Sequence, residues 1–167
     1  IIPDRDFFGT GYSVKIHRNK IYFGVSGGLY SADWKSYYNP LNPAPFRLIP
    51  KSKGQVWDVD IHLNEVLFGH HEGTFRVENN QAVQIAETPG TWSFSALKGY
   101  PEKLIAGNYT GLNAYSFENE EWNFSGTIKG SPTESCRIIA EDEKGIIWAA
   151  HPYRGVYRIV LDVEKNS

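Results

Sequence analysis

The chain has 167 residues, of which 41% are hydrophobic and 14% aromatic, so it is long enough to bury a core and is expected to form one globular unit. Lys and Arg number 17 and Asp and Glu number 19, a formal charge of −2 without a run of like charge, which argues against nucleic-acid binding by this segment. No apolar run approaches the roughly 18 residues of a membrane span, no signal peptide opens the chain, and a single cysteine, Cys136, excludes an internal disulfide.

Short apolar segments alternate with turn residues along the chain, and none has helical periodicity. In a first repeat we expect strands at residues 12–17, 21–25, 29–33 and 46–50, with an insertion at 34–45. In a second repeat the expected strands are 56–61, 66–70, 74–78 and 81–86. Asn79 and Asn80 supply a hairpin signal between the last two. Alternation within 56–61 predicts that Trp57, Val59 and Ile61 share one face.

Two further repeats follow the same plan. The third is expected to hold strands at 92–97, 103–107, 112–117 and 122–128. The fourth is expected to hold strands at 135–141, 146–150 and 156–161. Every repeat closes a tight polar turn on a glycine, and these four are Gly28, Gly73, Gly111 and Gly155, at steps of 45, 38 and 44 residues.

A period near 40 residues built from four short strands is the signature of β-propeller blades. The predicted fold is therefore all-β: a β-propeller of about four blades of four-stranded antiparallel sheet. The blades are expected at 11–50, 55–87, 91–129 and 134–163, within a single propeller segment that spans residues 1–167.

Three full blades and most of a fourth do not fill a large propeller, so we favour an open fragment of a larger array; a closed ring of four blades is the alternative. The chain contains no methionine, which also indicates a piece of a longer protein. Because the end blades of an arc expose apolar faces, we expect neighbouring blades or a second copy, as in a homodimer, to cover them. Any membrane association is expected through parts outside this chain.

The fourth repeat carries the clearest copy of the pattern. Its apolar strand is followed by Glu141 and Asp142, a glycine turn, an apolar pair that ends in Trp148, and a Gly-x-Tyr-Arg strand that ends at Arg158. This segment resembles the two-component-regulator propeller repeat. Weaker copies at 16–31, 59–77 and 97–115 fit with substitutions, so the resemblance covers nearly the whole chain.

The resemblance implies a periplasmic sensor propeller from a bacterial hybrid histidine kinase or a related membrane-bound regulator. Such propellers are large, paired and often tied to polysaccharide use. It therefore implies signal transduction and carbohydrate sensing, with any histidine kinase in another part of the parent protein. This chain itself contains no kinase, receiver or triple-tyrosine segment.

Candidate ligand-binding residues come from the topology of a four-stranded meander. The turns between second and third strands emerge on the same face as the links between blades, and this face should gather His70, His71, Tyr109, His151, Tyr153 and Arg154. Aromatic, imidazole and guanidinium groups suit an oligosaccharide, whose CH faces stack on rings and whose hydroxyls need donors and acceptors. The plainer alternative is that these are solvated turn residues.

No catalytic, metal or cofactor site is expected. His70 and His71 lack a third His or a Cys at ligand spacing, and no Ser-His-Asp, Cys-His or carboxylate arrangement stands out. The tryptophans Trp57, Trp92 and Trp148 are expected to pack rather than to contact a ligand.

These observations together favour a non-catalytic sensor module that binds an oligosaccharide within a two-component signalling protein. The alternative is an interaction scaffold without a small-molecule ligand. A lyase or hydrolase built on a propeller is the weakest interpretation.

Overall fold

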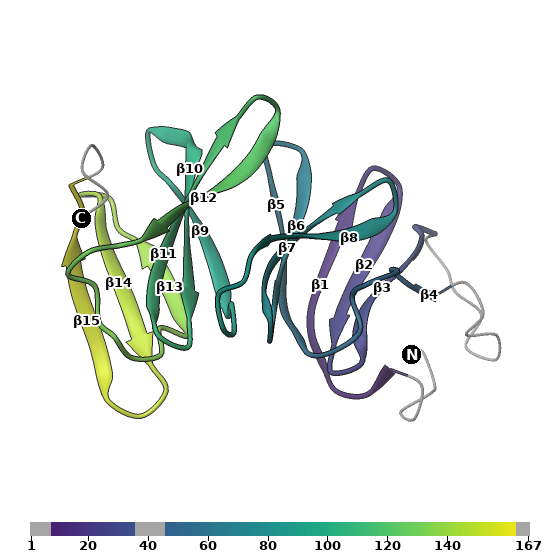
Figure 1. Ribbon diagram of the computed structural model, residues 1–167, viewed down its shortest axis with the longest axis horizontal. Coiled ribbons are helices and arrows are strands. Elements are labelled where there is room, and N and C mark those ends of the chain that lie inside the picture. Colours follow the sequence, from purple (N-terminus) through teal and green to yellow (C-terminus); the bar gives the residue numbers. More distant parts are fainter. Residues whose placement is uncertain (1–7, 36–45, 163–167) are drawn as a thin grey trace.

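The computed structural model describes residues 8–35 and 46–162. These residues form 15 strands in four antiparallel sheets, which confirms the prediction of an all-β propeller with about four blades (Figure 1). Within the described ranges, no helix is long and apolar enough to cross a membrane.

The strands pair in chain order in every sheet, so each sheet is an up-and-down meander. Sheet A holds β1 (Gly11–His17), β2 (Lys20–Val25), β3 (Gly28–Asp33) and β4 (Arg47–Leu48). Sheet B holds β5 (Val56–His62), β6 (Glu65–His70), β7 (Gly73–Glu78) and β8 (Gln81–Ala86). Sheet C holds β9 (Ser93–Leu97), β10 (Tyr100–Asn108), β11 (Gly111–Glu118) and β12 (Glu121–Thr127). Sheet D holds β13 (Ile138–Glu141), β14 (Ile146–His151) and β15 (Gly155–Val160).

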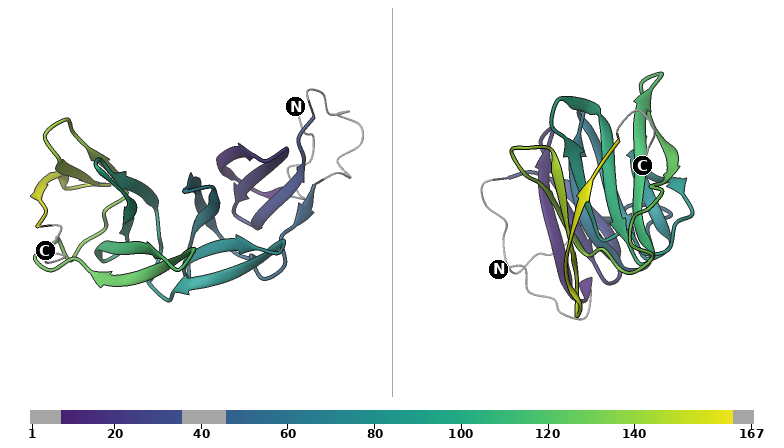
Figure 2. Two further views of the ribbon diagram at one scale, coloured as in Figure 1. Left: turned by 90° about the horizontal axis from the view of Figure 1, so that it is seen from above. Right: turned by 90° about the vertical axis from the view of Figure 1, so that its left-hand side faces the viewer.

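The four sheets fan out as an open arc (Figure 2). The first strands contact one another in sequence, β1 with β5, β5 with β9 and β9 with β13, while β8 and β12 run along the convex side. The two ends of the arc lie apart, so the closed four-bladed ring that the sequence left as an alternative is wrong.

Four hairpins, β1–β2, β5–β6, β7–β8 and β11–β12, owe their shape to two-residue turns. In each of them both residues have φ between 43° and 69°, the geometry of a type I′ turn that matches the twist of the flanking strands. Asparagine tolerates this region better than most residues, and it occurs in every one of the pairs, Arg18-Asn19, Leu63-Asn64, Asn79-Asn80 and Asn119-Glu120. The hairpin predicted at Asn79 and Asn80 is confirmed.

A one-residue β-bulge interrupts the first strand pair of sheets A and B. The register shifts at Tyr12 between β1 and β2, and at Trp57 between β5 and β6. A bulged residue leaves the simple alternation and its side chain is re-aimed. Val56 and Val59 consequently both lie fully buried in the core between sheets A and B, whereas strict alternation would place them on opposite faces. The predicted shared face is therefore confirmed for Val59 and Ile61, which pack in the same core, and wrong for Trp57.

Facing sheets bury continuous apolar seams. Phe68 and Leu29 lie in the seam between sheets A and B, and Trp122, only 1% exposed, lies in the seam between sheets B and C. The Trp122 indole donates to the His62 carbonyl at 3.4 Å, which ties β12 back to the end of β5. Each such side chain stabilises the fold by about 1.5–3 kcal/mol through burial.

Two predicted strands are shorter than expected because their ends serve the links between sheets. In the strand expected at 46–50, pairing is limited to Arg47–Leu48. In the strand expected at 135–141, Cys136 instead donates its N–H to Asn108 of the neighbouring sheet at 3.0 Å, and pairing begins at Ile138. Most of the insertion predicted at 34–45 lies outside the described residues.

Candidate functional site

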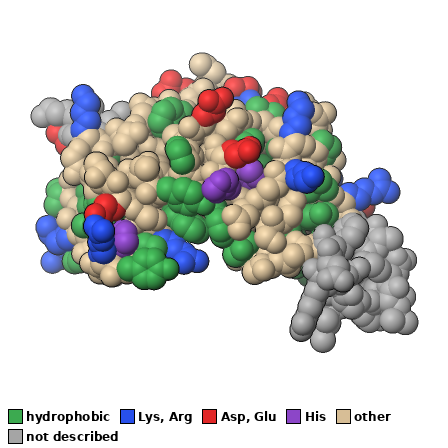
Figure 3. All heavy atoms as spheres, turned by 60° about the horizontal axis from the view of Figure 1, so that its bottom comes forward, with side chains coloured by type: hydrophobic (Ala, Val, Ile, Leu, Met, Phe, Trp, Pro, Cys, Tyr) green, Lys and Arg blue, Asp and Glu red, His purple; other side chains and the backbone are tan. Residues whose placement is uncertain are grey.

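The turns between second and third strands lie against the links between sheets, as the meander topology predicts. Gly54 in the link after sheet A donates to Gly27 at 3.4 Å, and Gly90 in the link after sheet B donates to His71 at 2.9 Å. Figure 3 views the molecule toward this side, where histidine and hydrophobic side chains gather near the middle. We call this surface the turn-and-link face.

Five rings on the turn-and-link face form a continuous series, which we call the aromatic row. Its members in order of contact are Tyr12, Trp57, Trp92, Tyr109 and His71. Successive ring centroids are 4.8, 4.5, 5.1 and 5.6 Å apart, with interplanar angles between 42° and 61°. The row therefore crosses from sheet A to sheet C without a break.

Backbone geometry and hydrogen bonds hold these rings in place. The two bulges set Tyr12 and Trp57. Trp92 donates its backbone N–H to Gly107 at 2.7 Å and its indole N–H to the Ser135 hydroxyl at 2.9 Å. Rings that are fixed on both backbone and side chain lose little further freedom when a ligand binds.

The far end of the row depends on a glycine. Gly90 has φ +64°, and the Tyr109 ring occupies the space that a Cβ would need at this position. The Tyr109 hydroxyl hydrogen-bonds His71 Nδ1 at 2.9 Å, so the two rings act as a unit. Burial raises the pKa of Tyr109, and the nearby Trp57 indole opposes this shift.

A hollow of about 260 Å³ opens beside the middle of the row. It is lined by Tyr12, Trp57, Asp58, Trp92, Ser93, Arg137 and Ile138. Trp57 and Trp92 are half-buried and Tyr12 is 39% exposed, so ring surface remains open to a ligand. Small-molecule sites typically start at about 300 Å³, so this hollow suits a single ring of a larger ligand.

Two charged groups line this hollow. The Arg137 guanidinium lies 4.8 Å from the Trp92 ring centroid, a cation–π contact. Asp58 Oδ1 accepts the Ser13 hydroxyl at 3.0 Å and the Val59 N–H at 2.9 Å. Burial raises the pKa of Asp58 in spite of these bonds. The hollow thus offers a donor group, an acceptor group and two indole surfaces.

The structure separates the two neighbouring histidines among the predicted ligand-binding residues. His71 is exposed and bonded to Tyr109, whereas His70 is only 3% exposed. His70 Nδ1 accepts the backbone N–H of Glu72 at 3.1 Å, and burial lowers the pKa of its ring. His70 therefore supports the turn from beneath the surface that His71 and Tyr109 form.

The other three predicted residues share the turn between β14 and β15. His151 Nδ1 accepts the N–H groups of Tyr153 and Arg154 at 3.0 and 3.1 Å, and Arg154 forms an ion pair with Glu134. Tyr153 is 93% exposed. Among the described residues, no hydrogen bond or ring contact joins this group to the aromatic row.

Sequence reasoning assigned Trp57 and Trp92 to packing and did not select Tyr12 or Arg137. One available signal was positional: Tyr12, Trp57 and Trp92 each stand at or beside the start of a first strand, and Arg137 takes that place in the last repeat. Trp148 is 40% exposed on the far side of sheet D, where its indole donates to Asp142 at 3.0 Å. Within the described ranges, no three His, Cys, Asp or Glu side chains are arranged to hold a metal ion.

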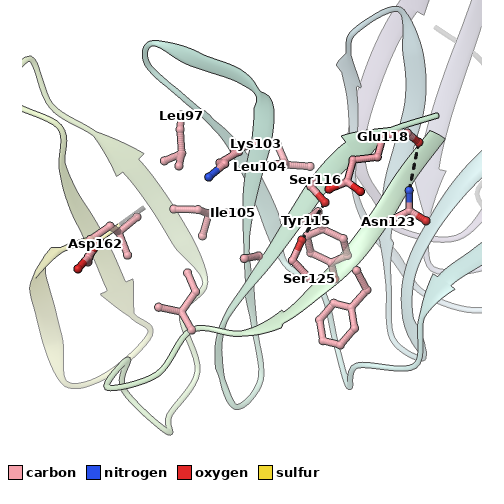
Figure 4. Close-up of a pocket in the computed structure, with 14 residues that line it drawn as sticks. Leu97, Lys103, Leu104, Ile105, Tyr115, Ser116, Glu118, Asn123, Ser125 and Asp162 are labelled. Carbon is pink, nitrogen blue, oxygen red and sulfur yellow. Dashed lines mark hydrogen bonds between the residues drawn. The ribbon is translucent and has the colours of Figure 1, made fainter. Parts of the chain in front are cut away.

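A second hollow, of about 440 Å³, lies between sheets C and D (Figure 4). Its walls include Leu97 at the end of β9 and Leu161 just after β15. In the preceding seam Trp122 on the fourth strand packs beside the end of β5. Sheet D has three strands among the described residues, and the hollow extends to Leu161 and Asp162 just after its last strand. We assign it to blade packing and not to ligand binding.

Comparison with known proteins shows the fold. No protein-family model matches the sequence, and no curated protein matches it. Two solved extracellular domains from B. thetaiotaomicron, each described as part of a hybrid two-component system, align with TM-scores of 0.61 and 0.63 at 14% and 11% identity. These alignments cover 97% and 92% of this chain and 23% and 25% of those chains.

The WD40 β-propeller domain of Doa1 aligns with a TM-score of 0.60 at 13% identity, covering 88% of this chain and 49% of that one. The chain thus spans about a quarter of the length of the two-component structures and half of the Doa1 structure. At such identities the likeness establishes a propeller architecture.

Proposed function

We propose that this chain is a non-catalytic ligand-binding module of a bacterial two-component sensor, located in the periplasm, and that its aromatic row binds an oligosaccharide. The observation that carries the proposal is the continuous series of five rings on the turn-and-link face. Such a row offers repeated stacking surfaces to a chain of sugar rings, which single exposed aromatic residues do not.

The polar groups around the row are suited to hydrogen-bond the hydroxyls of a sugar. Each pyranose presents hydroxyls that both donate and accept hydrogen bonds, and recognition requires a few fixed partners at the edge of the stacking surface. Asp58 and Ser93 stand beside the two indoles, and His71 with the Tyr109 hydroxyl stands at the far end. Donors and acceptors therefore accompany the rings along their length.

The sensor context is supported by the sequence repeat and by the architecture shared with the two extracellular domains. In this proposal the chain contributes recognition, and the response to binding is carried by domains of a longer protein. An arc of separate sheets suits this task because a ligand that bridges two sheets changes how they are held relative to each other.

The interaction scaffold remains the second candidate, and the outer face of sheet D favours it. Ile138, Val156 and Val160 are 64%, 63% and 66% exposed there, and Trp148 is 40% exposed. Apolar side chains gathered on one face mark a surface that contacts protein. In the proposed sensor this face is covered by a neighbouring blade or a second copy.

The test is calorimetric titration of the folded chain with a panel of oligosaccharides, for the wild type and for the double variant His71→Ala, Tyr109→Ala. Loss of two ring contacts of about 0.5–1.5 kcal/mol each should weaken binding by roughly tenfold or more. The matched control, His17→Ala with Tyr100→Ala, removes the same residue types from the opposite face and should bind like the wild type.

Circular dichroism confirms that both double variants are folded. Equal affinity of the two double variants would remove the turn-and-link face from the binding site. A chain that binds no saccharide of the panel but self-associates tightly would contradict the sensor proposal and support the scaffold.

A further inference from the structure

The hollow beside the aromatic row contains a cation that has no anionic partner among the residues that the structure describes. None of the ion pairs within the described residues includes Arg137, although other arginines such as Arg76 and Arg154 are paired with glutamates. Its guanidinium instead lies over the Trp92 ring at 4.8 Å. A stacked guanidinium keeps its N–H donors in the plane of the group, where they remain available to another acceptor.

The position of Arg137 is fixed by its own backbone. Its N–H donates to Ala150 at 2.9 Å within sheet D, and its carbonyl accepts the Ser93 hydroxyl at 3.1 Å from sheet C. The Arg137 guanidinium lies over the Trp92 ring, and the Trp92 indole N–H is itself held by the Ser135 hydroxyl at 2.9 Å. The cation is therefore presented at the hollow from an anchored main chain and over an anchored ring.

The lining of the hollow also offers an acceptor. Asp58 Oδ1 is occupied by Ser13 and Val59, whereas Oδ2 accepts no hydrogen bond within the described part of the chain. Oδ2 is thus available to a hydroxyl. Among the described residues no ion pair joins Asp58 to Arg137, and Ser13 and Val59 both donate to the Asp58 carboxylate.

Building on the proposed function, we propose that the hollow selects an acidic sugar: a hexuronate unit stacks on Trp57 and Trp92, its carboxylate pairs with Arg137, and one of its hydroxyls donates to Asp58. The hollow of about 260 Å³ takes one such ring, and the remaining units of the oligosaccharide extend along the row toward Tyr109.

Charge decides between an acidic and a neutral unit. The guanidinium fork matches a carboxylate in a bidentate manner, and such charge-assisted bonds are about twice as strong as those between neutral groups. A neutral sugar gains the stacking but leaves the cation unpaired. Because the whole chain carries a formal charge of −2, any preference for an anion must come from this local cation and not from bulk attraction.

The experiment compares a panel of hexuronate oligosaccharides with the neutral hexose oligosaccharides of the same ring configurations, at low and at high salt. The variant Arg137→Gln removes the charge and keeps a hydrogen-bonding side chain. The matched control, Arg158→Gln, removes an exposed arginine from the same sheet outside the hollow. We expect Arg137→Gln to weaken hexuronate binding by roughly tenfold to a hundredfold.

Neutral oligosaccharides should bind the wild type and Arg137→Gln with similar, weaker affinity, and Arg158→Gln should match the wild type. High salt should reduce the hexuronate preference. Equal binding of acidic and neutral panels, or an unchanged hexuronate affinity in Arg137→Gln, would overturn this inference. If binding of both panels nevertheless fell in the variant Trp57→Ala, the proposed oligosaccharide function would stand; if no saccharide bound at all, both proposals would fall.

Discussion

Replacing Trp122 by alanine should cost this protein a large share of its stability. Trp122 is 1% exposed in the seam between sheets B and C, its ring centroid lies 5.3 Å from that of Phe117, and its indole donates to His62. The substitution removes the buried ring and leaves a cavity between two rigid sheets, a change that costs about 3–5 kcal/mol. Whole domains are stable by only about 5–15 kcal/mol.

Phe124 provides a matched control on the same strand, β12. It is 41% exposed and its ring centroid lies 5.5 Å from that of Tyr115, so Phe124→Ala removes a partly solvated ring and creates no enclosed cavity. Full burial of such a side chain is worth about 1.5–3 kcal/mol, and the exposed fraction reduces the expected loss to about 1–2 kcal/mol.

Urea unfolding followed by far-ultraviolet circular dichroism measures both losses without relying on tryptophan emission. We expect the urea midpoint of Trp122→Ala to lie well below that of Phe124→Ala. The slope of the unfolding free energy against urea concentration should be the same in both variants. Equal losses in the two variants would refute the idea that fourth strands close the seams.

Two further changes test the site and the electrostatics. Gly90→Ala should destabilise the link after sheet B and alter the emission of the neighbouring rings, because the Tyr109 ring occupies the space of the new methyl group; unchanged unfolding and emission would contradict this packing. Burial opposes ionisation of Asp60, yet bonds from His62 and Lys15 outweigh it and lower its pKa to about 2. Its ionised form therefore stabilises the fold above the unfolded pKa of about 3.9, and this stability is lost as the pH falls toward 2. The free energy of unfolding of the variant Asp60→Asn should consequently fall less than that of the wild type between about pH 5 and pH 2, and parallel curves would refute the assignment.

The repeat made the sheets predictable because turn chemistry is local. Asn79 and Asn80 tolerate positive φ, and Gly73 closes the preceding turn, so hairpin positions follow from the residues themselves. The side of the propeller that gathers turns and links also followed from strand order. Local signals in the sequence did not predict that some strand ends pair with the main chain of a neighbouring sheet. Pairing of the main chain with a neighbouring sheet, as at Cys136, shortens β13 and depends on the assembled arc.

The site was harder to predict for the same reason. A bulge at Trp57 turns an apparently core-facing tryptophan toward a hollow, and nothing in the alternation of 56–61 announces it. His70 and His71 are adjacent and chemically identical, yet one is buried beneath Gly54 and the other contacts Tyr109 in the next sheet. Such distinctions arise from packing between sheets, which sequence periodicity does not describe.

Intrinsic fluorescence tests most directly whether the aromatic row is the binding surface. The chain has five tryptophans, and two of them, Trp57 and Trp92, belong to the row. Titration of the wild type with a hexuronate oligosaccharide should give a saturable change in emission. The double variant Trp57→Phe, Trp92→Phe should lose that change while Trp122 and Trp148 still report a folded chain. A full, saturable change that persists in the double variant would place binding elsewhere and contradict the account.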